Sequence, residues 1–277
     1  MNNLKLTEIE IHNTCNRKCN FCPNAFLDRG KYTEMDEETY LSILNELNNN
    51  NYNGAISYSR YNEPFFNADL LKKRVSQAKE ILPESLLVTN TNGDFLSEEA
   101  LDGLLIDELT IMDYDYKGQE ACVHHLLDIG AEITSVEYPF IYAKRESIKI
   151  IYFVDWLFHV ELEDRGGQLR FVDRIKRSNP CFEPTYFVGI DYDGTVVPCC
   201  HIRGDSEEQQ EMVLGNLRDG SVSEILASSH TCEVRNRTQN KQFSDPCKHC
   251  QKTEGRYTKK QPSMDYEIQY YCEEEVV

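Results

Sequence analysis

Residues 12–24, HNTCNRKCNFCPN, place three cysteines within eight residues and decide how the rest of the chain is interpreted. The spacing is C-x-x-x-C-x-x-C, whereas structural zinc sites usually combine two Cys-x-x-Cys pairs around one metal. Three thiolates on a four-iron cluster leave one iron without a protein ligand, and an open position is how a metal site binds a molecule that reacts. The pattern therefore favours an iron–sulfur cluster over zinc, with Cys15, Cys19 and Cys22 as its ligands.

Composition narrows the classes of protein that this motif can belong to. The chain has 277 residues, a formal net charge of −18 and 11 cysteines. Because an acidic surface repels phosphates, we expect neither nucleic acid nor an anionic membrane as a partner. The sequence contains no apolar run near the ~20 residues that span a bilayer and no N-terminal signal pattern. We therefore expect a cytoplasmic protein, in which so many cysteines indicate metal or redox chemistry rather than disulfides.

Strand-like and helix-like segments alternate over the first 156 residues. The expected strands are 7–13, 54–60, 85–93, 108–115, 131–140 and 149–156, and the expected helices between them are 35–49, 68–82, 97–105 and 119–129. Such alternation produces parallel strands joined by right-handed crossovers. Since six strands are two short of a closed eight-fold barrel, we predict an α/β fold with a partial, open (β/α)6 barrel. Active sites of such folds lie at the carboxyl ends of the strands, and the three cysteines directly follow the first strand.

The pattern changes near DRGG, residues 164–167, where the alternation fades and cysteines return. We therefore expect a barrel domain over 1–165 and a C-terminal domain over 166–277. The second domain contains a widely spaced set of four cysteines, Cys181, Cys199, Cys247 and Cys250. Four thiolates that include one Cys-x-x-Cys suit a closed zinc site and a fully ligated four-iron cluster equally well by spacing alone.

The stretch CNRKCNFC after a first strand resembles the signature of the radical S-adenosylmethionine (SAM) superfamily. In that family the fourth ligand of the open iron is SAM itself, through its amino and carboxylate groups. Reduction of the 4Fe–4S cluster then releases a 5′-deoxyadenosyl radical, which takes a hydrogen atom from the substrate.

The same resemblance implies which residues bind SAM. Phe21 is expected near the adenine. Further contacts are expected from SRYNEPF and TNTNG, which end the second and third strands, through Asn62, Glu63, Asn90 and Asn92. Asn62 replaces the usual glycine of this turn, and asparagine tolerates a left-handed backbone better than most residues.

The C-terminal order C…GTVVPC…LGNL…SEIL…CKHC resembles Twitch, the short form of the SPASM extension of radical SAM enzymes. The resemblance implies one auxiliary 4Fe–4S cluster on the four cysteines of the tail, because only Cys272 follows Cys250. Over nearly its whole length the chain is similar to radical SAM dehydrogenases of aminoglycoside biosynthesis. In these relatives the arginine of the Arg-Gly-Gly segment, here Arg165, contacts substrate hydroxyls.

These resemblances imply an oxidoreductase that takes a hydrogen atom from an alcohol carbon of a small polar substrate, an amino-sugar or aminocyclitol. The remaining electron would pass to the auxiliary cluster, and flavodoxin or ferredoxin would supply the electrons that start the reaction. The proton that leaves needs a base. Carboxylates at the ends of the expected strands are the candidates: Asp113, Asp115, Glu137 and Asp155.

Two other reactions stay open at this point. An epimerase would return a hydrogen atom to the substrate from a thiol, for which Cys200 and Cys232 are candidates. A peptide-modifying enzyme is the third alternative, although the cysteine motif begins at residue 15 and leaves no room for an N-terminal leader-binding domain. A non-catalytic iron–sulfur or zinc protein is disfavoured, because a protein that only stores electrons has no use for an open iron.

Overall fold

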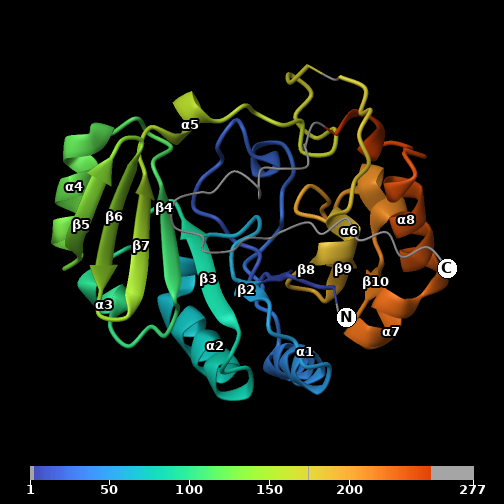
Figure 1. Cartoon of the computed structure of the whole chain (residues 1–277), viewed down its shortest axis with the longest axis horizontal. Coiled ribbons are helices and arrows are strands. Elements are labelled where there is room, and N and C mark those ends of the chain that lie inside the picture. The colour runs from blue at the N-terminus through green and yellow to red at the C-terminus, as the bar shows by residue number, and fades with distance from the viewer. Residues whose placement is uncertain (1–2, 174, 251–277) are drawn as a thin grey trace.

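A computed structural model describes residues 3–173 and 175–250, so Cys272 lies outside the described residues. Its centre is a ten-stranded sheet in the order β10-β9-β8-β1-β2-β3-β4-β7-β6-β5, with β10 and β5 at its edges (Figure 1). The strands are β1 (Leu6–Ile9), β2 (Ala55–Ser57), β3 (Leu86–Thr91), β4 (Glu108–Met112), β5 (Glu132–Glu137), β6 (Phe140–Arg145), β7 (Ile148–Phe153), β8 (Phe187–Ile190), β9 (Thr195–Val197) and β10 (Gly215–Asn216). The α-helices are α1 (Glu37–Asn49), α2 (Ala68–Ile81), α3 (Glu98–Leu101), α4 (Gly118–Asp128), α5 (Trp156–His159), α6 (Glu183–Tyr186), α7 (Val222–Ala227) and α8 (Ser229–Gln239).

Six neighbouring strands, β8-β1-β2-β3-β4-β7, are parallel. The prediction of an α/β fold with a partial, open barrel is therefore confirmed, but the six parallel strands are not the six that were expected. The expected fifth strand, β5, pairs antiparallel with β6, which in turn pairs antiparallel with β7. On the other side of the sheet, β8 from the C-terminal region lies parallel to β1.

The side chains of β5 explain why it leaves the parallel series. Its residues, EITSVE, are exposed or at most half-buried, as suits an antiparallel strand at the edge of a sheet. A parallel strand is covered on both faces and is mostly apolar, as β7 is with IKIIYF, in which every residue except Lys149 is buried. β6 (FIYAKR) is a strand that the sequence did not predict, and Glu146, at φ 52°, lies in the turn that returns it to β7.

Capping residues begin the helices near their expected positions. The Asp36 side chain accepts a hydrogen bond from the backbone N–H of Thr39 at the start of α1. Ser97 does the same for Ala100 at the start of α3. The expected helix over 97–105 is too long, because Gly103 takes a positive φ of 70° and turns the chain towards β4.

The C-terminal region continues the barrel sheet. The Asp-Gly turn at Gly194, with φ 82°, forms the predicted hairpin between β8 and β9. The expected domain boundary between residues 165 and 166 falls in the connection between α5 and α6. The hydrogen-bonded sheet contains strands from both sides of this boundary. Helices α7 and α8 lie beyond β10 (Figure 1). All helices within residues 3–250 are too short or too polar to span a bilayer.

Candidate active site

A cavity of about 270 Å³ lies where the carboxyl ends of the strands meet the cysteine loop. The cysteine loop contributes Cys15, Arg17, Cys19, Phe21, Cys22, Pro23 and Asn24. The ends of β2 and β3 contribute Ser59, Arg60, Tyr61, Asn62, Glu63, Asn90, Thr91 and Asn92. The remaining walls are Glu8, Met112, Tyr114, Trp156, Arg165 and Cys200. The fold therefore brings the predicted cluster ligands, the predicted SAM residues and two predicted substrate residues into one place.

The three cysteines of the loop form a donor set that suits an iron–sulfur cluster. The pKa of Cys15 is raised to about 12, mainly by burial and to a smaller extent by the nearby Glu63, Cys22 and Cys19. Burial, with the neighbouring Cys22, likewise raises the pKa of Cys19 to about 11. Thiolates this close repel one another unless a cation lies between them, and soft thiolates are the ligands that iron–sulfur clusters use. Among the described residues, no three Cys, His, Asp or Glu side chains are placed to hold one metal ion, so the fit rests on the donor chemistry.

Arg17, inside the cysteine motif, fixes the loop to the ends of two strands. Its Nε donates to Asp94 Oδ2 at 2.6 Å, after β3. Its Nη1 and Nη2 donate to the two carboxylate oxygens of Asp115 at 3.0 and 2.8 Å, after β4. Asp115 is therefore an anchor of the cysteine loop, which corrects its expected place among the candidate bases.

Glu63 is the buried carboxylate of the cavity. It accepts hydrogen bonds from Thr91 Oγ1 at 2.6 Å, from the backbone N–H of Asn92 at 2.8 Å and from that of Phe65 at 3.1 Å. Burial raises its pKa, because desolvation disfavours the charged form. A cationic group bound beside Glu63 would offset that cost, as the expected contact with the SAM ammonium requires.

Asn62 holds the turn in a different way from the one expected. It is not among the described residues with positive φ, so its tolerance of a left-handed backbone is not used. Its Oδ1 accepts from the backbone N–H of Arg60 at 3.0 Å, and its Nδ2 donates to Tyr58 O at 3.2 Å. The side chain thus closes the turn that presents Glu63.

The two asparagines of TNTNG lie at the cavity with different surroundings. Asn92 Nδ2 donates to Asn16 Oδ1 in the cysteine loop at 2.9 Å, and Asn92 Oδ1 accepts from the backbone N–H of Asp94 at 2.9 Å. Asn90 has an exposed side chain, and its backbone N–H donates to Ser59 Oγ at 3.1 Å. Asn92 therefore joins the loop to β3, while Asn90 presents its amide to the cavity.

Phe21 belongs to a group of three aromatic rings on one wall. Its ring centroid lies 5.0 Å from that of Tyr114 and 5.3 Å from that of Trp156. Tyr114 and Trp156 meet edge to face at 5.3 Å. Such a wall offers flat apolar surface to a ring such as adenine. Sequence reasoning missed the other two rings, although Trp156 is the single tryptophan of the chain and ends an expected strand.

Arg165 reaches the cavity because the DRGG turn has a left-handed backbone. Arg165, Gly166 and Gly167 all have positive φ, of 51°, 65° and 84°. A Cβ at Gly166 would lie 2.5 Å from Gln209 Nε2 and 3.0 Å from His201 O, so only glycine fits there. The turn places the Arg165 side chain on the cavity wall beside Tyr61 and Cys200.

The structure places the expected bases away from the cavity. Asp113 is buried, and its carboxylate accepts hydrogen bonds from the backbone N–H groups of Asp115, Lys117 and Asp155 at 3.0 to 3.1 Å. Asp155 itself accepts from Tyr138 Oη at 3.2 Å, outside the cavity lining. Both carboxylates therefore organise the loops after β4 and β7 and do not line the cavity.

Two further candidates are also distant from the cavity. Glu137 is exposed on the edge strand β5, because that strand leaves the parallel series. Cys232 is exposed on α8. Cys200 is different, since it lines the cavity and its carbonyl accepts a hydrogen bond from Tyr61 Oη at 2.9 Å.

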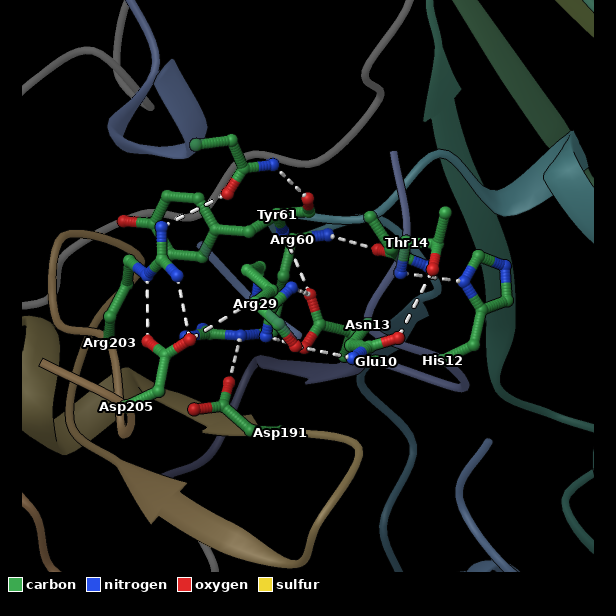
Figure 2. Close-up of polar contacts among 12 residues, drawn as sticks. Glu10, His12, Asn13, Thr14, Arg29, Arg60, Tyr61, Asp191, Arg203 and Asp205 are labelled. Carbon is green, nitrogen blue, oxygen red and sulfur yellow. Dashed lines mark hydrogen bonds and ion pairs between the residues drawn. The ribbon is translucent and has the colours of Figure 1, made fainter. Parts of the chain in front are cut away.

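A buried network of ion pairs joins the cysteine loop to the C-terminal region (Figure 2). Arg29 donates from Nη1 and Nη2 to the two oxygens of Glu10 at 2.5 and 2.6 Å. Glu10 Oε1 also accepts from the backbone N–H of Tyr61 at 3.1 Å. Burial would raise the pKa of Glu10, but Arg29 and then Arg60 outweigh this effect and lower the pKa.

The network continues into the C-terminal region. Arg203 Nη1 donates to Asn24 Oδ1 at 3.0 Å, and Asn24 Nδ2 donates to Tyr61 O at 2.6 Å. Arg203 Nε and Nη2 bind Asp205 at 2.8 and 2.6 Å (Figure 2). Arg60 Nε binds Asp191 Oδ1 at 2.8 Å. These contacts fix the segment after Cys199 against the segment after Cys22.

The four cysteines of the tail lie near one another in the structure. The pKa of Cys181 is raised to about 11 and that of Cys247 to about 12, in each case mainly by burial and in part by Cys250. The pKa of Cys199 lies well above its ordinary value through burial and then through nearby thiols that include Cys247, Cys250 and Cys181. Four mutually repelling thiolates form a donor set that a cationic cluster would stabilise.

Comparisons with known proteins agree with this geometry. Residues 181–251 match the SPASM family, described as an iron–sulfur cluster-binding domain, which decides between the zinc and cluster interpretations of the tail. The structure is similar to that of BtrN in complex with AdoMet and 2-DOIA, with a TM-score of 0.70 and 25% identity over 90% of this chain and 94% of that one. The fold, the site and these similarities thus agree with the prediction of a radical SAM enzyme with a SPASM-type C-terminal region.

The sequence comparison leads to a particular relative. The chain is 28% identical over 252 residues to the S-adenosyl-L-methionine-dependent 2-deoxy-scyllo-inosamine dehydrogenase of Niallia circulans. That alignment covers 88% of this chain and 92% of the relative. The fold also matches BtrN in an open conformation, with a TM-score of 0.62 and 22% identity over 90% of this chain and 92% of that one.

Proposed function

We propose that this protein is a radical SAM dehydrogenase that oxidises an alcohol carbon of an amino-sugar or aminocyclitol to a ketone. The observation that carries the proposal is that Arg165 and Cys200, from the C-terminal half, line the same cavity as the three cysteines of the N-terminal loop. A substrate in this cavity lies between the two cysteine sets, as a reaction with a separate electron acceptor requires. The name of the Niallia circulans relative supports the substrate class.

The chain's own residues hold and orient the reactants. When bound, a 4Fe–4S cluster and SAM supply hydrogen-atom abstraction, and an auxiliary 4Fe–4S cluster accepts the remaining electron. Cys15, Cys19 and Cys22 would ligate the first cluster, and Glu63 would face the ammonium of SAM. The aromatic wall at Phe21 would offer its apolar surface to the adenine.

Arg165 is the proposed substrate residue, with its guanidinium donating hydrogen bonds to substrate hydroxyls. Glu8 brings a second carboxylate to the cavity lining, on β1, 3.3 Å from Arg60 Nη1. Sequence reasoning missed Glu8, although its alternation with the core residues Thr7 and Ile9 places it on the barrel interior. We propose that Glu8 matches the charge of a substrate amine.

The test is anaerobic reconstitution followed by reduction with dithionite in the presence of SAM. About eight irons per chain, formation of 5′-deoxyadenosine and a ketone from an aminocyclitol would support the proposal. Zinc in place of iron, or no deoxyadenosine from loaded protein, would contradict it. Arg165→Ala is expected to reduce substrate turnover while leaving uncoupled cleavage of SAM unchanged, and Glu8→Gln to raise KM for an amine substrate but not for its hydroxyl analogue.

Epimerisation is a second candidate reaction, because the Cys200 thiol lines the cavity. Cys232 is exposed on α8 and does not line this cavity. A dehydrogenase keeps its activity in Cys200→Ala and gives a ketone without solvent deuterium at the reacting carbon. An epimerase loses its product in Cys200→Ala, and the wild-type enzyme incorporates deuterium from solvent.

The proposal also includes a cytoplasmic location, flavodoxin or ferredoxin as the electron donor, and a division into two domains between residues 165 and 166.

A further inference from the structure

His201 is a buried histidine that the sequence did not single out, with both ring nitrogens in contact. Its side chain is 2% exposed. Nε2 lies 2.7 Å from Glu163 Oε2, and Nδ1 lies 3.5 Å from the Sγ of Cys250. The ring also hydrogen-bonds Cys200. It therefore spans the space between a carboxylate and two thiols, one of which, Cys250, is among the four cysteines proposed to ligate the auxiliary cluster.

The chemistry of these neighbours determines what the ring does. A carboxylate accepts hydrogen bonds only, and an iron-bound thiolate is likewise an acceptor. A ring held between the two donates N–H to both. Hydrogen bonds to the sulfurs of an iron–sulfur cluster stabilise its more negative, reduced form, and are a main determinant of its reduction potential.

The side chain of Gln209 fixes the backbone that carries His201. Gln209 Nε2 donates to Gly166 O at 2.9 Å and to His201 O at 3.2 Å. Its Oε1 accepts from the backbone N–H of Arg203 at 2.8 Å. One buried glutamine thus joins the DRGG turn to the segment that carries His201. Glu163 stands two residues before Arg165, so the same turn presents one side chain to His201 and another to the cavity.

We propose that Glu163 and His201 form a positioning pair that hydrogen-bonds the Cys250 ligand and raises the reduction potential of the auxiliary cluster. The inference rests on the proposed function, because it requires a cluster on these four cysteines. After one hydrogen atom has been taken from the alcohol carbon, formation of the ketone releases one proton to solvent and one electron. A cluster held by the four cysteines would accept that electron, and a higher potential would favour the transfer.

The experiment isolates the auxiliary cluster in the full chain. Cys15, Cys19 and Cys22 are replaced by alanine together, and the variant is reconstituted anaerobically and titrated with a redox indicator while the reduced cluster is followed by EPR. Adding His201→Phe is expected to shift the reduction equilibrium about tenfold towards the oxidised form, which for one electron is about 59 mV. Adding His201→Asn, which keeps a neutral donor, is expected to give a smaller shift in the same direction, as is Glu163→Gln.

His249→Phe is the matched control, because His249 lies in the same C-x-x-C segment but pairs with Asp245, 3.4 Å away, at the surface. The reduction potential of the auxiliary cluster in this variant is expected to equal that in the parent, in which only Cys15, Cys19 and Cys22 are replaced. Equal potentials in the His201→Phe and His249→Phe variants would overturn the inference. If the His201→Phe variant does not retain iron, the His201→Asn and Glu163→Gln variants test the inference in its place. An auxiliary-cluster potential equal to that of the parent in both of these variants would also overturn the inference. A parent without about four irons would instead refute the auxiliary cluster, and with it the proposed function.

Discussion

Replacing Arg29 by methionine tests whether the network in Figure 2 holds the cysteine loop in place. Glu10 is fully buried and accepts two charge-assisted hydrogen bonds from Arg29, at 2.5 and 2.6 Å. Removing one partner of such a pair leaves a buried charge without its main compensation, which typically costs ~3–5 kcal/mol. For a chain of this size, each kcal/mol lowers the melting temperature by about 2–4 °C, so a loss of roughly 6–20 °C is expected.

Thermal unfolding of the reconstituted protein under anaerobic conditions measures this loss. Arg170→Met is the matched control, since Arg170 pairs with Glu208 at the surface, where the two side chains are 78% and 64% exposed. Exposed pairs contribute ~0–1 kcal/mol. Adding Glu10→Gln to Arg29→Met removes the buried charge, and should therefore recover part of the stability. Equal melting temperatures in Arg29→Met and Arg170→Met would refute the structural role of the network.

The same pair predicts a dependence on pH. The pKa of Glu10 is lower in the folded chain than its ordinary value, because Arg29 and Arg60 favour the carboxylate. A group with a lowered folded pKa stabilises the protein above its unfolded pKa, and this contribution is lost as the pH falls through the folded value. The difference in stability between wild type and Arg29→Met is therefore expected to be greatest near neutral pH and to shrink below about pH 4. A difference that grows on acidification would contradict this assignment.

Three further predictions concern the cysteine loop and the DRGG turn. Cys15→Ala is expected to abolish formation of 5′-deoxyadenosine, measured by chromatography, and persistent cleavage of SAM would contradict the ligand assignment. Asp115→Asn weakens one of the two carboxylate contacts of Arg17 and is expected to raise the Kd for SAM several-fold in equilibrium binding, with no effect expected on folding. Gly166→Ala should destabilise the chain by ~1–3 kcal/mol in urea unfolding, because it strains a positive φ and meets Gln209. Part of that loss should return in combination with Gln209→Ala, and a neutral Gly166→Ala would contradict the account of the turn.

Local chemistry explains why much of the site could be predicted from the sequence. The ligand spacing of Cys15, Cys19 and Cys22 is set within one loop, and the strand before that loop places it at the carboxyl end of the barrel. Glu63 follows β2 in the same way. Helix caps such as Ser97 depend on residues three positions apart, so the start of α3 is readable without the fold.

The expected catalytic bases show where this reasoning stops. Asp113, Glu137 and Asp155 all lie near the ends of expected strands, and position along the chain alone cannot distinguish a carboxylate that faces a cavity from one that caps a loop. The Asp113 carboxylate is taken up by hydrogen bonds from backbone N–H groups, one of them that of Asp155, 42 residues away. Glu137 is removed from it because β5 pairs at the edge of the sheet.

By itself, then, the sequence determined the class of chemistry: thiolate spacing, strand and helix periodicity and the DRGG turn are encoded within short segments. Tertiary structure decided which strands are neighbours, because parallel pairing joins residues as far apart as Leu6 and Phe187. It also decided which charges meet. Arg203 reaches Asn24 across 179 residues, and His201 meets Cys250 across 49. Contacts of this kind form because buried polar groups must be hydrogen-bonded in the folded chain. Local sequence propensity does not specify which groups those partners are.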